Sequence, residues 1–133
     1  MIIVDASVLA AALGDDGSEG KRARGRLRGE ELAVPHIADL EVASVLRGRV
    51  RGGHLTVPRA RQALDDLADL PLERVSHATL LPRVWELREN YPPSDAAYIA
   101  LAELFRAPLV TGDARMSRGS AARCAFELVD VSS

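Results

Sequence analysis

The sequence predicts an α/β fold in which a central parallel sheet is covered by helices on both faces. Short apolar runs, some rich in β-branched residues, alternate along the chain with longer segments whose apolar residues recur at helical spacing. This alternation is typical of parallel strands joined by helical crossovers. Because 133 residues with 47% hydrophobic content suit one core, we expect a single domain over residues 1–133.

The first elements are a strand and two short helices. Residues 2–4 form a β-branched run that stops at Asp5, which predicts a buried strand with a carboxylate at its C-terminal end. A short helix is expected over 7–13. After a turn rich in Gly and Asp, Ser18 is the expected N-cap of an exposed basic helix over 21–28.

A second strand over 32–34 leads into the helix expected over 36–51. Two glycines, Gly52 and Gly53, end that helix. Its apolar residues recur at helical spacing, at Ile37, Leu40, Ala43, Leu46 and Val50. This spacing predicts the helix.

Two further helices flank a weak strand candidate over 72–75. Thr56, followed by a proline two residues later, opens the first helix, and Pro71 stops it. The second helix is amphipathic over 80–90. Trp85 lies at core spacing in it, so we expect the indole to pack inside.

The last third of the chain contains one helix and two strands. Ser94 is the expected N-cap of an Ala-rich helix that runs to Arg106, which puts Asp95 in its first turn. Strands are expected over 109–111 and 126–129.

Acidic residues occur where such a sheet presents its ligand-binding edge. Asp5 and Asp113 each follow a strand, and Asp95 begins a helix over the same edge. Glu41 shares a helical stripe with Ser44 and Gly48 on an otherwise apolar element, so it is expected to face a polar internal site. Four like charges in one cleft repel one another unless a cation neutralises them, which favours a bound metal.

The residue types around this edge indicate which metal and which chemistry. Carboxylate oxygens without a Cys pair or a His-x-x-x-His spacing favour Mg²⁺ or Mn²⁺ over zinc, copper or iron. Such an ion activates water and offsets the charge that develops in phosphoryl transfer. Each carboxylate alone is as readily a cap or turn residue, so the prediction depends on the four together.

Other Asp-using α/β designs lack their characteristic residues here. The sole lysine, Lys21, has no P-loop frame and cannot serve a receiver domain, which needs a lysine after a late strand. A small phosphatase of the haloacid dehalogenase type would carry Asp-x-Asp, whereas this chain has Asp5-Ala6-Ser7. A module that binds an ion without catalysis stays open.

Four segments in this order give the chain a family resemblance: residues 2–9, residues 34–42, residues 95–103 and residues 109–113. They resemble the PIN-domain ribonucleases, and within them the VapC-type toxins of bacterial toxin–antitoxin pairs. The resemblance implies a PIN-like three-layer α/β/α sandwich. It also implies a metal-dependent endoribonuclease that acts as a toxin, with a non-catalytic metal- or RNA-binding PIN-like module as the alternative.

The resemblance further implies the roles of individual residues and the partners. Asp5, Glu41, Asp95 and Asp113 would be the catalytic residues and the ligands of Mg²⁺ or Mn²⁺, while Ser7 and Thr111 would be pocket hydroxyls. Similar proteins cleave RNA, form homodimers and are inhibited by a cognate VapB-type antitoxin.

Composition adds an expected location and a constraint on RNA binding. The single Cys124 and the absence of an apolar run of about 18 residues favour a cytoplasmic protein without a membrane partner. The formal net charge of -2 gives no overall attraction for RNA. Apart from the four carboxylates, however, 15 acidic residues stand against 17 basic ones, so a defined groove is expected to recognise the substrate.

Overall fold

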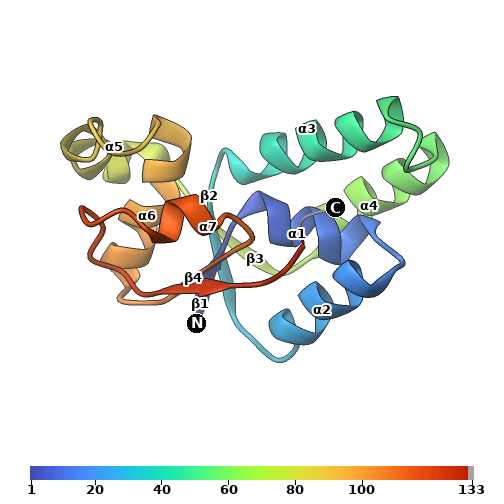
Figure 1. The fold of residues 1–133 in the computed structure, drawn as a ribbon, viewed down its shortest axis with the longest axis horizontal. Coiled ribbons are helices and arrows are strands. Elements are labelled where there is room, and N and C mark those ends of the chain that lie inside the picture. Colours follow the sequence, from blue (N-terminus) through green and yellow to red (C-terminus); the bar gives the residue numbers. More distant parts are fainter. Residues whose placement is uncertain (132–133) are drawn as a thin grey trace.

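A computed structural model describes residues 1–131, and in this part of the chain five parallel strands form one sheet (Figure 1). Their order across the sheet is β3-β2-β1-β4-β5, and every neighbouring pair is parallel. The strands are β1 (Ile2–Val4), β2 (Leu32–Pro35), β3 (Leu72–Val75), β4 (Leu109–Thr111) and β5 (Phe126–Leu128).

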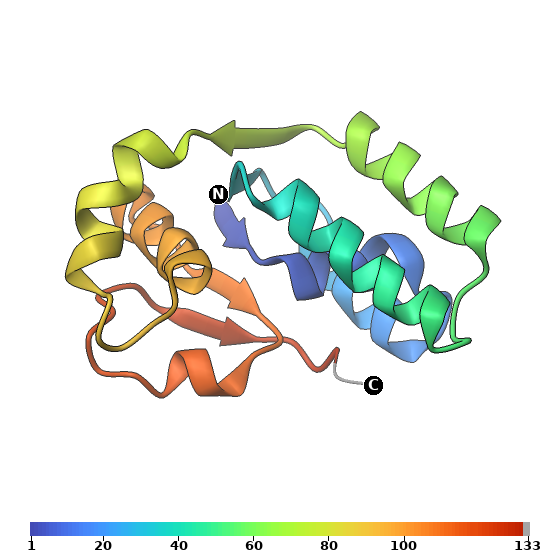
Figure 2. The same cartoon turned by 90° about the horizontal axis from the view of Figure 1, so that it is seen from above.

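Helices cover both faces of the sheet, which confirms the expected three-layer α/β/α arrangement (Figure 2). On one face, α6 packs against β1, β2 and β4, and α5 packs on α6. On the other face, α1 contacts β4 and is surrounded by α2, α3 and α4. The helices are α1 (Ala6–Gly14), α2 (Ser18–Leu27), α3 (Ala38–Arg51), α4 (Val57–Asp69), α5 (His77–Glu86), α6 (Pro93–Phe105) and the short α7 (Ala114–Ser117).

The core is formed by β1, β2, β4, the inner face of α1 and the middle of α6. The strands β1 and β4 are buried throughout. Every residue from Ala96 to Ala102 is also buried. A helix that is apolar on all sides is stable only inside a protein, and its small alanines allow α6 to lie close to the sheet. The N-terminus of α6, which carries Asp95, is thereby fixed over the strand ends.

The structure confirms the predicted order of strands and long helices. It places the helix expected over 80–90 at His77–Glu86 and corrects two N-caps. Gly17, not Ser18, is the N-cap of α2, and Ser18 is its first residue. Pro92 is the N-cap of α6 and Pro93 its first residue, so Ser94 is not the cap. Proline is well suited to the first helical position because its φ is already helical and its missing N–H has no partner there.

Trp85, which was expected in the core, is exposed, and so is the apolar Leu40 of α3. Leu40 is 71% exposed and Trp85 is 68% exposed. The buried face of α3 contains Ala38, Val42 and Leu46 instead. Helical spacing identifies a set of residues that share a face, but the packing of neighbouring elements decides which face is covered.

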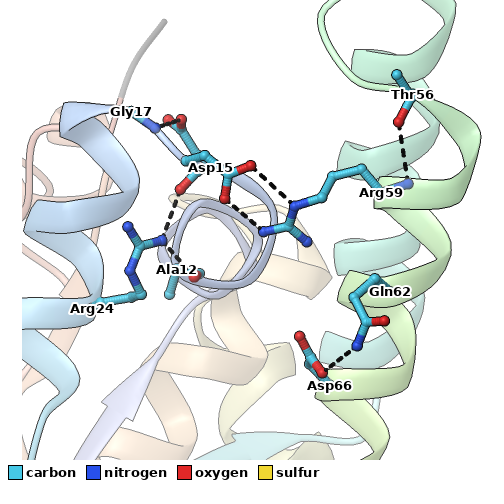
Figure 3. A network of polar contacts seen from close by, with 9 residues as sticks. Ala12, Asp15, Gly17, Arg24, Thr56, Arg59, Gln62 and Asp66 are labelled. Atoms are coloured by element: carbon cyan, nitrogen blue, oxygen red, sulfur yellow. Dashed lines mark hydrogen bonds and ion pairs between the residues drawn. The ribbon is translucent and has the colours of Figure 1, made fainter.

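The turn from α1 to α2 is closed by arginine side chains (Figure 3). Arg24 donates to the carbonyl oxygens of Ala12 at 3.1 Å and Asp15 at 2.7 Å. Arg59 of α4 binds both oxygens of the Asp16 carboxylate, at 3.0 and 3.2 Å. These contacts satisfy backbone acceptors at the end of α1 and tie it to its two neighbours.

Close packing at this turn predicts opposite effects for two glycines of α2. A Cβ on Gly20 would lie 1.8 Å from the carbonyl oxygen of Asp15, whereas one on Gly25 would meet nothing within 4 Å. We expect Gly20→Ala to lower the free energy of unfolding by about 3 kcal/mol because backbone must move. Gly25→Ala is the matched control and should raise it by up to about 1 kcal/mol through helix propensity. Urea unfolding monitored by circular dichroism measures the free energy of unfolding of both variants. Equal changes in the two would contradict the close packing at Gly20.

Candidate active site

The candidate site lies where the strand order reverses, between β1 and β4. From β1 the chain builds the sheet outward through β2 and β3, then crosses back to place β4 on the other side of β1. Ligands of open parallel sheets bind at the carboxyl ends of the strands at this switch point. Val4 pairs with Val110, so Asp5 and Thr111 come level at the same edge.

All four predicted carboxylates line one cavity of about 360 Å³ at this edge. The cavity is lined by Asp5, Ala6, Ser7, Glu41, Ser44, Val45, Asp95, Tyr98, Asp113 and Met116. A larger hollow of about 690 Å³ lies elsewhere, among residues of α1, α2 and α4. Volume therefore does not identify the site, whereas the convergence of acidic side chains from four separate segments does.

Asp5 is the most enclosed of the four carboxylates, at 6% exposed. It is the N-cap of α1, and its Oδ1 accepts from the Val8 backbone N–H at 3.2 Å and from the Ser7 hydroxyl at 2.6 Å. Its Oδ2 accepts from the Thr111 hydroxyl. Burial raises the pKa of Asp5, and the hydrogen bonds from Ser7 and Thr111 act in the opposite direction. These donors hold the side chain in a single orientation.

The two hydroxyls also connect the ends of β1 and β4. The Ser7 Oγ accepts from the backbone N–H of Gly112 at 3.2 Å, and the Thr111 Oγ1 accepts from that of Asp113 at 3.0 Å. A Cβ on Gly112 would lie 3.1 Å from the Ser7 Oγ and would overlap Val131. Glycine at this position therefore permits the close approach that the hydroxyl network requires.

The other three carboxylates come from the starts of helices. Glu41 and Asp95 lie in the first turns of α3 and α6, where the helix dipole favours negative charge. Asp113 is the N-cap of α7, and its Oδ1 accepts from the Arg115 N–H at 2.9 Å. The Arg115 side chain lies 3.7 Å from the same oxygen and is 86% exposed.

Asp95 shows that the four carboxylates interact electrostatically. Burial raises its pKa most, followed by the charges of Asp113, Glu41 and Asp5, while Arg115 acts in the opposite direction. Close like charges raise the pKa of a carboxyl because they disfavour its ionised form. The cavity is therefore a region of concentrated negative potential.

Sequence reasoning did not single out Tyr98. Its hydroxyl donates to the Glu41 Oε1 at 2.7 Å, and its side chain is only 2% exposed. The sequence carried one signal: Tyr98 follows Asp95 by three positions and so shares its face of α6. That spacing is equally typical of an aromatic residue in the core.

The donor set fits a hard divalent cation. Carboxylate and hydroxyl oxygens line the cavity, and oxygen ligands are those that Mg²⁺ and Mn²⁺ prefer. Within residues 1–131, however, no three His, Cys, Asp or Glu side chains are grouped closely enough to form a ready-made metal cage. An ion would have to draw the carboxylates together.

Comparison with known proteins identifies the family. The family model for the PIN domain matches residues 2–121, which include all four carboxylates. The chain belongs to the PIN-domain family. This PIN domain is 40% identical over 129 residues to VapC ribonuclease Mb0985 of Mycobacterium bovis, covering 97% of this chain and 98% of the relative. It is 36% identical to Ribonuclease VapC1 of Mycobacterium tuberculosis, covering 96% of each. The relatives support its placement among VapC-type PIN domains.

Solved structures support the same fold. The crystal structure of Mycobacterium tuberculosis VapC20, described as a sarcin-ricin loop cleaving toxin, matches with a TM-score of 0.66 over 88% of this PIN domain and 93% of that chain, at 20% identity. PAE2754 from Pyrobaculum aerophilum matches with a TM-score of 0.64 over 94% of this chain and 81% of its own, at 22% identity. At these identities the likeness concerns the fold alone.

Burial of Asp95 and charge repulsion in the pocket predict that removing this carboxylate stabilises the metal-free protein. The raised pKa of Asp95 means that its ionised form costs free energy in the folded state but not in the unfolded chain. We expect Asp95→Asn to raise the melting temperature by about 2–4 °C at pH 7.5 in EDTA. The gain should shrink as the pH falls, because the folded protein takes up a proton at Asp95 at a higher pH than the unfolded chain does, and it should vanish below about 3.8.

The control for this prediction is Glu89→Gln, which removes an exposed carboxylate outside the pocket. Its melting temperature should stay within about 1 °C of the original at both pH values. A lower melting temperature for Asp95→Asn at pH 7.5 would mean that Asp95 contributes more through its contacts than it costs through repulsion.

Proposed function

We propose that this PIN domain is an Mg²⁺- or Mn²⁺-dependent endoribonuclease that acts as the toxin of a toxin–antitoxin pair. The observation that carries the proposal is the convergence of Asp5, Glu41, Asp95 and Asp113 on one cavity. It is supported by relatives named VapC ribonucleases that are up to 40% identical over nearly the whole chain.

The four carboxylates would hold the cation, with the most direct contact from Asp5 and Asp95. When bound, the ion would lower the pKa of a coordinated water and offset charge on a phosphate oxygen. Ser7 and Thr111 keep both oxygens of Asp5 in place, so Asp5 needs little reorganisation to bind. In the reaction, a bond forms between the water oxygen and phosphorus while the phosphodiester bond to the leaving oxygen breaks.

RNA, a polyanion, must approach a strongly acidic cavity. The bound cation would cancel much of that charge, and basic side chains at the rim would contact flanking phosphates. Arg115 is suited to this role because it is exposed beside Asp113. Recognition would therefore depend on local contacts, since the net charge of the chain is -2.

Pairing with a VapB-type antitoxin and with a second copy of the chain belongs to the same proposal. Large apolar side chains are exposed on α3 and α5, including Leu40, Leu81 and Trp85, and such surface is typical of protein interfaces. Within residues 1–131, no helix is long and apolar enough to cross a bilayer. We place the activity in the cytoplasm, where the RNA substrates are.

The first test is cleavage of RNA by the purified protein in Mg²⁺ or Mn²⁺. We expect Asp5→Asn and Asp95→Asn each to reduce the rate by about a hundredfold or more, because each removes a charged ligand of the ion. EDTA should abolish cleavage, and Glu89→Gln should leave the rate unchanged. Full activity in either pocket variant would exclude the proposed site. Metal binding without turnover would favour a non-catalytic PIN-like module.

The toxin role is tested separately by expression in a bacterial host. We expect the unaltered chain to arrest growth and the Asp95→Asn variant to leave growth normal, because the arrest depends on cleavage. Co-expression of a small gene found directly beside this one should restore growth if that gene encodes the antitoxin. Normal growth with the active enzyme would argue against a toxin while leaving the ribonuclease assignment intact.

A further inference from the structure

Tyr98 is a buried tyrosine whose hydroxyl contacts one of the four carboxylates of the pocket. Its hydroxyl lies inside the protein, 2.7 Å from one oxygen of Glu41, and points its hydrogen at that oxygen. The carboxylate accepts and cannot donate when ionised, so the tyrosine must be the donor. The other Glu41 oxygen, Oε2, has no hydrogen-bond partner in the part of the chain that the structure describes.

The same hydroxyl joins two of the four segments that carry the acidic residues. Tyr98 belongs to α6, one turn after Asp95, and Glu41 belongs to α3. The hydroxyl thus links the helix that carries Asp95 to the helix that carries Glu41.

The hydrogen bond from Tyr98 holds the carboxylate of Glu41, which has fewer hydrogen-bond partners than that of Asp5. Asp5 is held by two hydroxyls and a backbone amide, whereas Glu41 extends from its helix on a longer side chain with one more rotatable bond. Within residues 1–131, Tyr98 provides the one hydrogen bond to the Glu41 carboxylate. Without it, repulsion from the neighbouring carboxylates would push Glu41 away from the cavity.

We propose that Tyr98 is a positioning residue that fixes Glu41 through Oε1 and leaves Oε2 free for the cation. This inference rests on the proposed function, since it assigns Tyr98 a part in building that metal site. Tyr98 does not itself bind the ion. Residues that hydrogen-bond to metal ligands typically change metal affinity by about 10- to 100-fold when they are removed.

The test is the dissociation constant for Mn²⁺, measured by electron paramagnetic resonance of the free ion without any RNA present. We expect Tyr98→Phe, which deletes the hydroxyl and keeps the ring, to weaken Mn²⁺ binding by about tenfold. Mn²⁺ binding within about twofold of the unaltered protein would overturn the proposal. Thermal unfolding of both proteins checks that the variant is folded.

Tyr91→Phe is the matched control. Tyr91 is also buried, and its hydroxyl donates to the Met116 carbonyl oxygen at 3.1 Å, so the variant loses a buried hydrogen bond without touching a carboxylate. It should change Mn²⁺ affinity by less than about twofold. An equal loss in both variants would mean that general loosening, not the contact with Glu41, explains the effect.

A double-mutant cycle separates action through Glu41 from other causes. In a Glu41→Ala background, Tyr98→Phe should have no further effect on Mn²⁺ affinity, because the group it positions is gone. An undiminished tenfold loss in that background would overturn the proposal. If the unaltered protein binds no Mn²⁺, the proposed function itself fails, which is a different result from equal binding by the two proteins.

A measurement on the unaltered protein covers the case in which Tyr98→Phe does not fold. The chain has only two tyrosines, so ¹³C-tyrosine labelling gives two sets of ring signals. Mg²⁺ should shift the Tyr98 signals clearly more than those of Tyr91. An ion bound to Glu41 changes the hydrogen bond that the Tyr98 hydroxyl donates, and the ring signals respond to that change. Equal or absent shifts at saturating Mg²⁺ would contradict a coupling between Tyr98 and the ion.

Discussion

Mutual repulsion among four carboxylates is the constraint on which the structure of this PIN domain depends. Asp5, Glu41, Asp95 and Asp113 line one cavity, and the pKa of Asp95 is raised by burial and by the other three charges. An arrangement of this kind is unfavourable by itself and requires the surrounding fold to hold it. The hydrogen bonds around the cavity have this role, and a bound cation would relieve the remaining cost.

The layers of the fold determine how firmly each carboxylate is held. The buried strand β1 leads directly into Asp5, and the buried, Ala-rich α6 keeps the first turn that carries Asp95 over the strand ends. Hydroxyls then connect the segments: Ser7 and Thr111 link β1 to β4, while Tyr98 links α6 to α3. The precision of the site thus comes from core elements, with neutral donors placed between the charges.

The distribution of charge along the chain bears on how a slightly acidic protein can act on RNA. Four of the 19 acidic residues line the cavity, and outside it 15 acidic residues stand against 17 basic ones. Many of those arginines are engaged within the protein. Arg24 binds backbone carbonyls and Arg59 pairs with Asp16, so both stabilise the helices around α1. Binding of RNA would therefore rely on a small number of basic side chains near the cavity, such as Arg115.

Local sequence patterns were sufficient for the order of the elements and for the four carboxylates. A β-branched run ending at Asp5, a second run ending before Asp113, and helical periodicity between them reflect the physics of strands and helices alone. Only the tertiary structure decided which helix faces are covered, and it placed Trp85 on the surface. It also revealed that Tyr98 meets Glu41, 57 positions away. Periodicity specifies a face, whereas the partner of that face depends on how distant segments pack.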